Sequence, residues 1–207
     1  MMKKPIVTFF AGVNGCGKTT MYYDELEKGN TFGYRINIDE MVSSFGDWKN
    51  PKDQIRASKI ALKIRNVMIK SRQDFNQETT LCGSSILRLV KDLKQSGYCI
   101  SLYYISVASP QIAKDRVKLR VSKGGHNIKP QIIERRFYLS LQNFYQVYPL
   151  CDNVVFFDNT QGFEKLFEKQ ECQECQECKD YKNKIESFIE NIFKNNQKEQ
   201  TFIRSFT

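Results

Sequence analysis

The sequence has one histidine, and no apolar run approaches the roughly 18 residues that a membrane-spanning helix needs. The lone His126 excludes a metal site built from several histidines, and its place in a glycine-rich stretch argues against a Ser-His-Asp triad. No cleavable apolar signal region precedes the first predicted strand. We therefore expect a cytoplasmic protein.

Cysteine is more frequent, with seven residues, an odd number. Three of them, Cys172, Cys175 and Cys178, lie in a Gln-Glu-Cys triplet repeated over 170–178. Their spacing resembles part of a ferredoxin cluster motif, but no further cysteine follows, so repeat expansion is the preferred interpretation. In a reducing compartment the other four serve as small apolar residues rather than as disulfides: Cys16, Cys82, Cys99 and Cys151.

A formal net charge of +9 over 207 residues indicates an anionic partner or substrate. Nucleotides, nucleic acid, phosphosugars and an acidic protein all satisfy this condition, and charge does not choose among them. The length and the 41% of apolar residues fit one α/β domain with a long tail.

Residues 12–19 form a Gly-x4-Gly-Lys-Thr phosphate loop between an apolar strand at 5–11 and a helix over 18–27. A glycine-rich turn that only caps a helix is the alternative, but the flanking elements and the Lys-Thr pair favour the loop. Lys18 is placed to reach the β- and γ-phosphates of ATP, and the Thr19 hydroxyl to bind Mg²⁺. We assign nucleotide binding to Gly12, Asn14, Gly15, Cys16, Gly17, Lys18, Thr19 and Thr20.

Strands and helices alternate along the chain, which predicts a parallel three-layer α/β sheet, and with the phosphate loop this is the fold of P-loop NTPases and kinases. We expect a kinase domain over 1–167 with a helical lid at about 116–136. The low-complexity repeat and a C-terminal helix occupy 168–207, and the apolar stripe of this helix is typical of docking on its own core. Further strands are predicted at 34–39, ahead of Cys82, at 98–107 and at 153–158, and further helices at 51–72, 110–122 and from Pro130.

Polar residues fall where the predicted strands end, at the sheet edge that binds ligands in parallel α/β folds. Asp39 is the last residue of the second strand and is placed to accept a proton from a substrate hydroxyl. Glu78 and Thr80 end the third. The fourth ends without an aspartate, so the usual second Mg²⁺-holding acid is missing there, which argues against a mechanical ATPase. The only Asn-Lys pair lies in the tail, which argues against a GTPase.

Arginines surround the glycine-rich turn at 124–125 and suit a lid over a phosphoryl-transfer site. Arg116 and Arg120 share one face of the preceding helix, and Arg135 and Arg136 lie in the following one. An ordinary helical hairpin with basic surfaces is the alternative. A second group of cations lies on the helix over 51–72, where it forms either a ligand surface or a solvated face: Arg56, Lys59, Lys63 and Lys70.

Seven segments, in this order, together resemble the zeta toxin family, specifically its smaller zeta-like members. They are residues 12–20, 37–40, 78–81, Arg116 with Arg120, 124–128, 135–137 and 158–160. The resemblance implies a kinase that uses ATP and Mg²⁺ to phosphorylate a sugar hydroxyl of UDP-N-acetylglucosamine. It also implies a possible antitoxin partner.

The resemblance further implies residue roles. Lys18 is the phosphate-loop lysine, Asp39 the base, and Arg120 and Arg136 stabilise phosphate charge. Glu78 and Thr80 contact the substrate, and Asn159 lies near adenine. Arg116, on the same helix face as Arg120, is a further substrate-binding candidate. Lys59 stands where relatives tend to have arginine and is a further substrate-binding candidate.

Two other functions remain open. The basic charge fits a polynucleotide 5′-hydroxyl kinase, although the cationic helix has no interleaved aromatic residues for base stacking. A nucleotide-binding regulatory module without transfer is the third interpretation, with the tail helix recruiting a partner.

Overall fold

A six-stranded sheet forms the centre of the protein in the computed structural model, which describes residues 4–169 and 176–195. The strand order is β2-β3-β1-β4-β5-β6, with the first five parallel and β6 antiparallel to β5. The α/β class and the parallel sheet expected from the sequence are confirmed. The strands are β1 (Ile6–Ala11), β2 (Tyr34–Ile36), β3 (Phe75–Thr79), β4 (Cys99–Ser106), β5 (Asn153–Asp158) and β6 (Glu164–Lys169).

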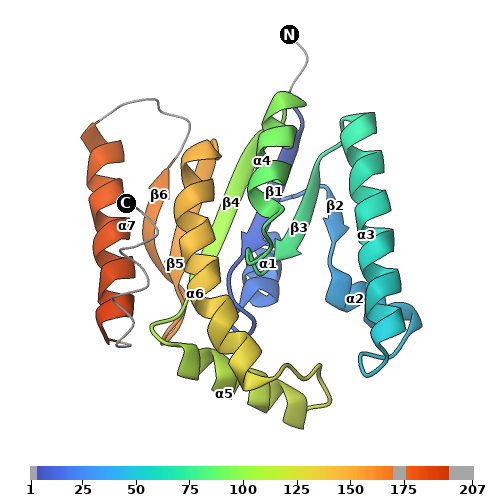
Figure 1. Cartoon of the computed structure of the whole chain (residues 1–207). Helices are drawn as coiled ribbons and strands as arrows, with labels where there is room; N and C mark the ends of the chain where they lie inside the picture. Colours follow the sequence, from blue (N-terminus) through green and yellow to red (C-terminus); the bar gives the residue numbers. More distant parts are fainter. Residues whose placement is uncertain (1–3, 170–175, 196–207) are drawn as a thin grey trace.

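Helices cover both faces of the sheet (Figure 1). In that view α4 and α6 lie in front of the strands and α1 behind them, while α3 flanks β2 at one edge. Helix α5 crosses below the carboxyl ends of the strands, beside the turn that leads to α6. The helices are α1 (Lys18–Glu27), α2 (Ile38–Phe45), α3 (Pro51–Ser71), α4 (Ile86–Gln95), α5 (Pro110–Ser122), α6 (Pro130–Val147), the short 3-10 helix η1 (Tyr148–Leu150) and α7 (Gln176–Asn195).

The two central strands are apolar on both faces because helices cover both. In β1, Phe9 and Phe10 are fully buried, and the Phe10 ring stacks on Tyr103 of β4 with centroids 5.1 Å apart. Near-continuous apolar sequence is typical of such doubly covered parallel strands. β1 ends at Ala11, directly before Gly12 of the phosphate loop.

The second strand is shorter than the sequence predicts. It ends at Ile36, and the expectation that Asp39 is its last residue is wrong, because Asp39 lies in the first turn of α2. The reason is local: the Asn37 side chain accepts hydrogen bonds from the backbone N–H groups of Asp39 (2.9 Å) and Glu40 (3.3 Å). This N-cap starts a helix where the alternating sequence favours a strand.

The C-terminal part adds a strand that the sequence did not predict. β6 continues the sheet to Lys169, so the sheet extends past the expected boundary after residue 167. The apolar stripe of α7 docks on the core as expected, with Ile185, Ile189, Ile192 and Phe193 buried. Of the repeat cysteines, Cys172 and Cys175 lie outside the described residues, and the side chain of Cys178 in α7 is not described. None of the described helices has the length and apolar composition needed to cross a membrane.

Candidate functional site

The phosphate loop is a tight turn between β1 and α1 that needs glycine at defined positions. Gly12 has φ +138°, and a Cβ there would stand 2.1 Å from the Ile105 carbonyl oxygen. Gly17 has φ +104°, and a Cβ there would stand 2.5 Å from Nδ2 of Asn159. A larger residue would strain the backbone at either position, and it would meet the backbone of β4 at Gly12 and the Asn159 side chain at Gly17. Gly15 and Gly17 of the loop and Lys18 and Thr19 at the start of α1 line one space, and a loop that precedes a helix N-terminus is a common anion-binding arrangement.

Asn159 supports this loop from the far side. Its Nδ2 donates a 2.8 Å hydrogen bond to the Cys16 carbonyl oxygen, and only 9% of the residue is exposed. It is not among the residues that line the cleft described below, so its predicted contact with adenine stays a prediction. Cys16 is fully buried, and this burial raises the pKa of its thiol. The thiol is therefore protonated and shielded at neutral pH.

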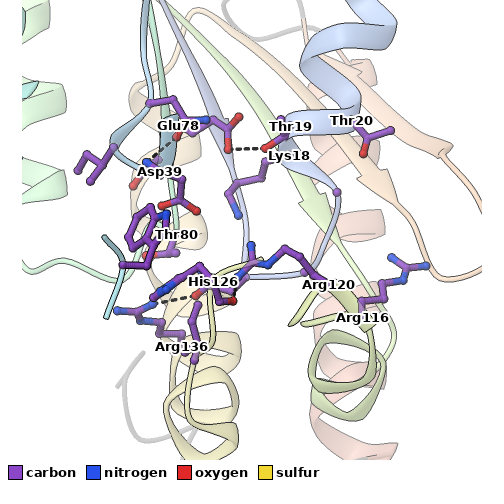
Figure 2. Close-up of a pocket in the computed structure, with 18 of the residues that line it drawn as sticks. Lys18, Thr19, Thr20, Asp39, Glu78, Thr80, Arg116, Arg120, His126 and Arg136 are labelled. Carbon is purple, nitrogen blue, oxygen red and sulfur yellow. Dashed lines mark hydrogen bonds between the residues drawn. The ribbon is translucent and has the colours of Figure 1, made fainter. Parts of the chain in front are cut away.

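A cleft of about 500 Å³ opens at the carboxyl edge of the sheet in front of the loop (Figure 2). Most of the predicted site residues line it, from four separate parts of the chain. They are Asn14, Gly15, Gly17, Lys18, Thr19, Thr20, Asp39, Glu78, Thr80, Arg116, Arg120 and Arg136. Further lining residues that the sequence did not single out include Trp48, Gln54 and Gln77. The fold thus brings the loop, the first turn of α2, the end of β3 and the lid helices together.

On the α2 side of the cleft lies Asp39. Figure 2 shows its carboxylate facing the same space as the Lys18 side chain. The Lys18 ammonium donates a 3.0 Å hydrogen bond to the Val13 carbonyl oxygen, which keeps the charge beside the loop. A carboxylate and an ammonium that share one open space suit a proton acceptor next to a phosphate-binding cation.

An acid does lie beside the Thr19 hydroxyl, on the third strand, where the sequence reasoning expected Glu78 as a substrate contact and not as a partner of Thr19. β3 and β4 both flank β1, and Glu78 lies near the carboxyl end of β3. The Thr19 hydroxyl donates a 3.1 Å hydrogen bond to Oε2 of Glu78. A hydroxyl beside a carboxylate is a hard oxygen donor set of the kind Mg²⁺ prefers, with ATP phosphates and water completing its shell. Within the described residues, no group of three or more His, Cys, Asp or Glu could hold a metal ion without such help.

Three arginines of the lid helices line the cleft and donate hydrogen bonds to the segments around it. Arg136 of α6 donates from Nη1 to the Asn14 side-chain oxygen at 2.9 Å, which joins the lid to the phosphate loop. Arg120 of α5 donates to the His126 carbonyl oxygen at 2.8 Å, and Arg116 to that of Thr160 at 3.2 Å. Among the described atoms, the buried Arg120 Nε has no hydrogen-bond partner. The predicted lid therefore carries cations at the mouth of the site.

The structure does not bring Lys59 to the cleft. Lys59 is exposed on α3, as are Arg56, Lys63 and Lys70, and none of the four lines the cavity. The predicted role of Lys59 in substrate binding is therefore not supported by the geometry. The cationic stripe lies on an exposed face of α3, outside the cleft.

An aromatic contact that the sequence did not suggest joins two residues that line the cleft. Trp48 lies between α2 and α3, and its ring lies 4.1 Å from the His126 ring in the lid turn. The contact spans 78 positions of sequence, and no local pattern marks it. It connects the lid to the segment that carries Asp39.

The position of His126 against Trp48 predicts that the stability of the protein depends on pH. Burial lowers the pKa of His126 from its ordinary value of 6.5; nearby Asp39 raises it, and Arg120 and Arg136 lower it. As the pH falls through 6.5, His126 binds a proton more readily in the unfolded chain than in the folded protein. The free energy of unfolding should therefore fall as pH decreases toward the folded pKa. The free energy of unfolding, measured with urea, is expected to fall less between pH 7 and pH 5 in His126→Gln than in the unaltered protein. If the free energy of unfolding falls equally in both proteins, His126 does not cause the pH dependence.

Comparison with known proteins supports the same family that the sequence motifs suggest. The zeta toxin family profile matches residues 1–171. An uncharacterised protein of Haemophilus influenzae is 33% identical over 131 residues, which cover 62% of this chain and 90% of that protein.

Solved structures share the fold. A structure from the PezAT chromosomal toxin–antitoxin system of Streptococcus pneumoniae matches with a TM-score of 0.62 at 13% identity, over 93% of this chain and 88% of its own. A structure of AvrRxo1-ORF1 and ORF2 with ATP matches with a TM-score of 0.65 at 14% identity, over 88% of this chain and 64% of its own. At these identities the likeness establishes the fold alone.

Proposed function

The chain belongs to the zeta toxin family, and from this premise we propose that it transfers the γ-phosphoryl group of ATP to a hydroxyl of a nucleotide sugar such as UDP-N-acetylglucosamine. Family and fold make it a P-loop kinase. The observation that carries the proposal of a hydroxyl acceptor is the carboxylate of Asp39, which shares one cleft with the phosphate loop and the lid arginines.

The phosphate loop and α1 hold ATP in this proposal. Lys18 and the loop N–H groups bind the β- and γ-phosphates, and the start of α1 adds a favourable dipole. The Thr19 hydroxyl binds Mg²⁺, and its neighbour Glu78 supplies a carboxylate on the same side. Bound Mg²⁺ neutralises charge on the phosphate oxygens.

Asp39 orients the acceptor and takes its proton. The acceptor oxygen forms a bond to the γ-phosphorus while the bond from that phosphorus to the bridging oxygen of ADP breaks. The hydroxyl proton passes to the Asp39 carboxylate. Thr80, which lines the cleft next to Asp39, contacts the acceptor in this arrangement.

Arg120 and Arg136 stabilise the charge that develops on the transferred group. Both line the cleft from the lid side, opposite the carboxylates. Arg136 is already tied to the phosphate loop through Asn14, so its guanidinium is oriented before substrate binds. Orientation before binding is what makes such cations effective in phosphoryl transfer.

A protein partner for this chain is proposed by analogy with a similar structure. A similar fold occurs in the PezAT toxin–antitoxin system, and we propose that this chain also has an antitoxin partner. Co-expression with the product of a neighbouring open reading frame, followed by co-purification, is the direct check.

Two alternatives have less support. A polynucleotide kinase would use the cations of α3, but these are exposed and do not line the cleft. A regulatory module would offer the apolar stripe of the tail helix to a partner, but Ile185, Ile189 and Phe193 are buried against the chain's own core.

The test separates all three functions. The protein is incubated with ATP and Mg²⁺, in separate reactions with UDP-N-acetylglucosamine, a cell metabolite extract and a 5′-hydroxyl oligonucleotide. Mass spectrometry is expected to find a metabolite that gains one phosphoryl group, absent with Lys18→Ala. A product from the oligonucleotide alone would favour the polynucleotide kinase, and ATP binding without any product would favour the regulatory module. Either result would overturn the proposal.

A further inference from the structure

An arginine outside the cleft, Arg35 of β2, links two glutamates beside the phosphate loop. Its Nη2 lies 2.5 Å from Oε1 of Glu78 and 2.6 Å from Oε1 of Glu40. Its Nε also donates to both carboxylate oxygens of Glu40 at 2.9 Å. The Arg35 side chain is 14% exposed, and that of Glu78 is 11% exposed. A charge pair this buried is held far more firmly than a surface pair, because leaving either partner unpaired is costly.

The rest of the guanidinium is also held. Nη1 donates to the side-chain oxygen of Asn76 at 3.3 Å, and Cζ stands 3.6 Å from the centre of the Tyr22 ring in α1. Arg35 is not among the residues that line the cleft. Its influence on the reaction therefore has to pass through the groups it holds, of which Glu78 is the one that reaches the site.

Glu78 uses its two oxygens differently. Oε1 accepts from Arg35, and Oε2 accepts the hydrogen of the Thr19 hydroxyl. A threonine hydroxyl has one hydrogen and two lone pairs. With the hydrogen directed to Glu78, both lone pairs of Thr19 remain available to a cation.

We propose that Arg35 is a positioning residue that fixes the Glu78 carboxylate so that Thr19 presents its lone pairs to Mg²⁺. This rests on the proposed function, in which Thr19 binds the metal of Mg·ATP. It deepens that function by naming the residue that holds Glu78 on the metal side of the site. Without Arg35, Oε1 of Glu78 would lose its partner and the carboxylate would face the like charge of Glu40, which shares the Arg35 Nη2, so a position away from Thr19 would become more favourable.

The test measures metal binding without transfer. Mn²⁺ replaces Mg²⁺ as the probe, a non-hydrolysable ATP analogue replaces ATP, and electron paramagnetic resonance gives the Mn²⁺ dissociation constant. Arg35→Met is expected to weaken Mn²⁺ binding by about 10-fold or more, the usual effect of losing a partner behind a metal ligand. Affinity for the analogue without metal should stay within about twofold. Arg35→Lys should recover part of the loss, because an ammonium can pair with Glu78 but cannot serve both glutamates.

A double variant asks whether Arg35 acts through Glu78. Arg35→Met/Glu78→Gln is expected to bind Mn²⁺ as Glu78→Gln does, within about twofold, because the carboxylate that Arg35 positions is already gone. The double variant also removes the unpaired buried charge, so it serves if Arg35→Met alone does not fold. The matched control is Arg88→Met, at an exposed arginine of α4, which should leave Mn²⁺ binding unchanged.

Three results would overturn the proposal: Mn²⁺ affinity unchanged in Arg35→Met, Mn²⁺ affinity unchanged in Glu78→Gln, or a further loss in the double variant. Failure of the proposed function has a different signature. A protein that binds Mn²⁺ with the analogue in this Arg35-dependent way but phosphorylates no hydroxyl would refute the transfer reaction and leave the positioning role intact.

Discussion

Asparagine in place of Asp39 is expected to lower kcat by about 10²- to 10⁴-fold, the range that a general base contributes. The amide has nearly the same shape but cannot take the proton from the acceptor hydroxyl. Asp39 lies in the first turn of α2, outside the phosphate loop, so affinity for ATP should change little. Steady-state kinetics with the acceptor found by the transfer assay, together with calorimetry of ATP binding, measures the two effects separately.

Glu40, the next residue, cannot replace the missing base. Both of its carboxylate oxygens already accept hydrogen bonds from Arg35, and Oε1 accepts another from the Asn37 side chain. The matched control is Asp115→Asn, at an exposed position of α5 that does not line the cleft, and it should keep full activity. Full kcat in Asp39→Asn would show that another group accepts the proton.

The overall architecture could be predicted because its signals are local. The phosphate loop is defined by glycines whose special conformations leave few substitutes, and the first helix runs over Lys18–Glu27 as predicted. The fifth strand likewise runs over Asn153–Asp158 as predicted, because its apolar run has clear ends. Where one stretch carries the whole signal, sequence and structure agree.

Strand order is not a local signal, and the errors follow from that. The sequence showed that β4 ends without an acid, but it could not show that β3 flanks β1 on the other side. For that reason Glu78 was not expected beside Thr19. Arg35 was missed for the same reason, since its partners Glu78 and Asn76 are about 40 residues away in sequence.

Competing local preferences explain two further differences. The stretch before Asp39 alternates as a strand should, but the Asn37 side chain caps a helix there. β6 has charged residues at both ends, and the apolar pair Leu166 and Phe167 is too short to predict a strand. Pairing with β5 decides its conformation. At Asp39 a local helix cap therefore outweighs the strand pattern, and in β6 pairing with a distant strand outweighs a weak local propensity.

Methionine in place of Arg136 is expected to lower kcat by about 10³-fold or more, within the range that arginines contribute to phosphoryl transfer. The loss has two physical parts: the charge opposite the transferred group disappears, and the link from α6 to Asn14 of the phosphate loop breaks. Arg136→Lys should recover only part of the rate, because an ammonium restores the charge but not the planar fork of donors. Kinetics with ATP and the identified acceptor gives the comparison.

The neighbouring residue provides the matched control. Arg135 is exposed and does not line the cleft, although the sequence placed both arginines in a lid over a phosphoryl-transfer site. Arg135→Met removes the same charge from the same turn of α6, so a general effect of net charge or helix stability should appear equally in both variants. A large loss at Arg136 with little change at Arg135 therefore attributes the effect to the position facing the cleft. Equal losses of kcat in the two variants would show that both arginines act through the lid as a whole. An unchanged kcat in Arg136→Met would show that Arg136 has no role in the transfer step.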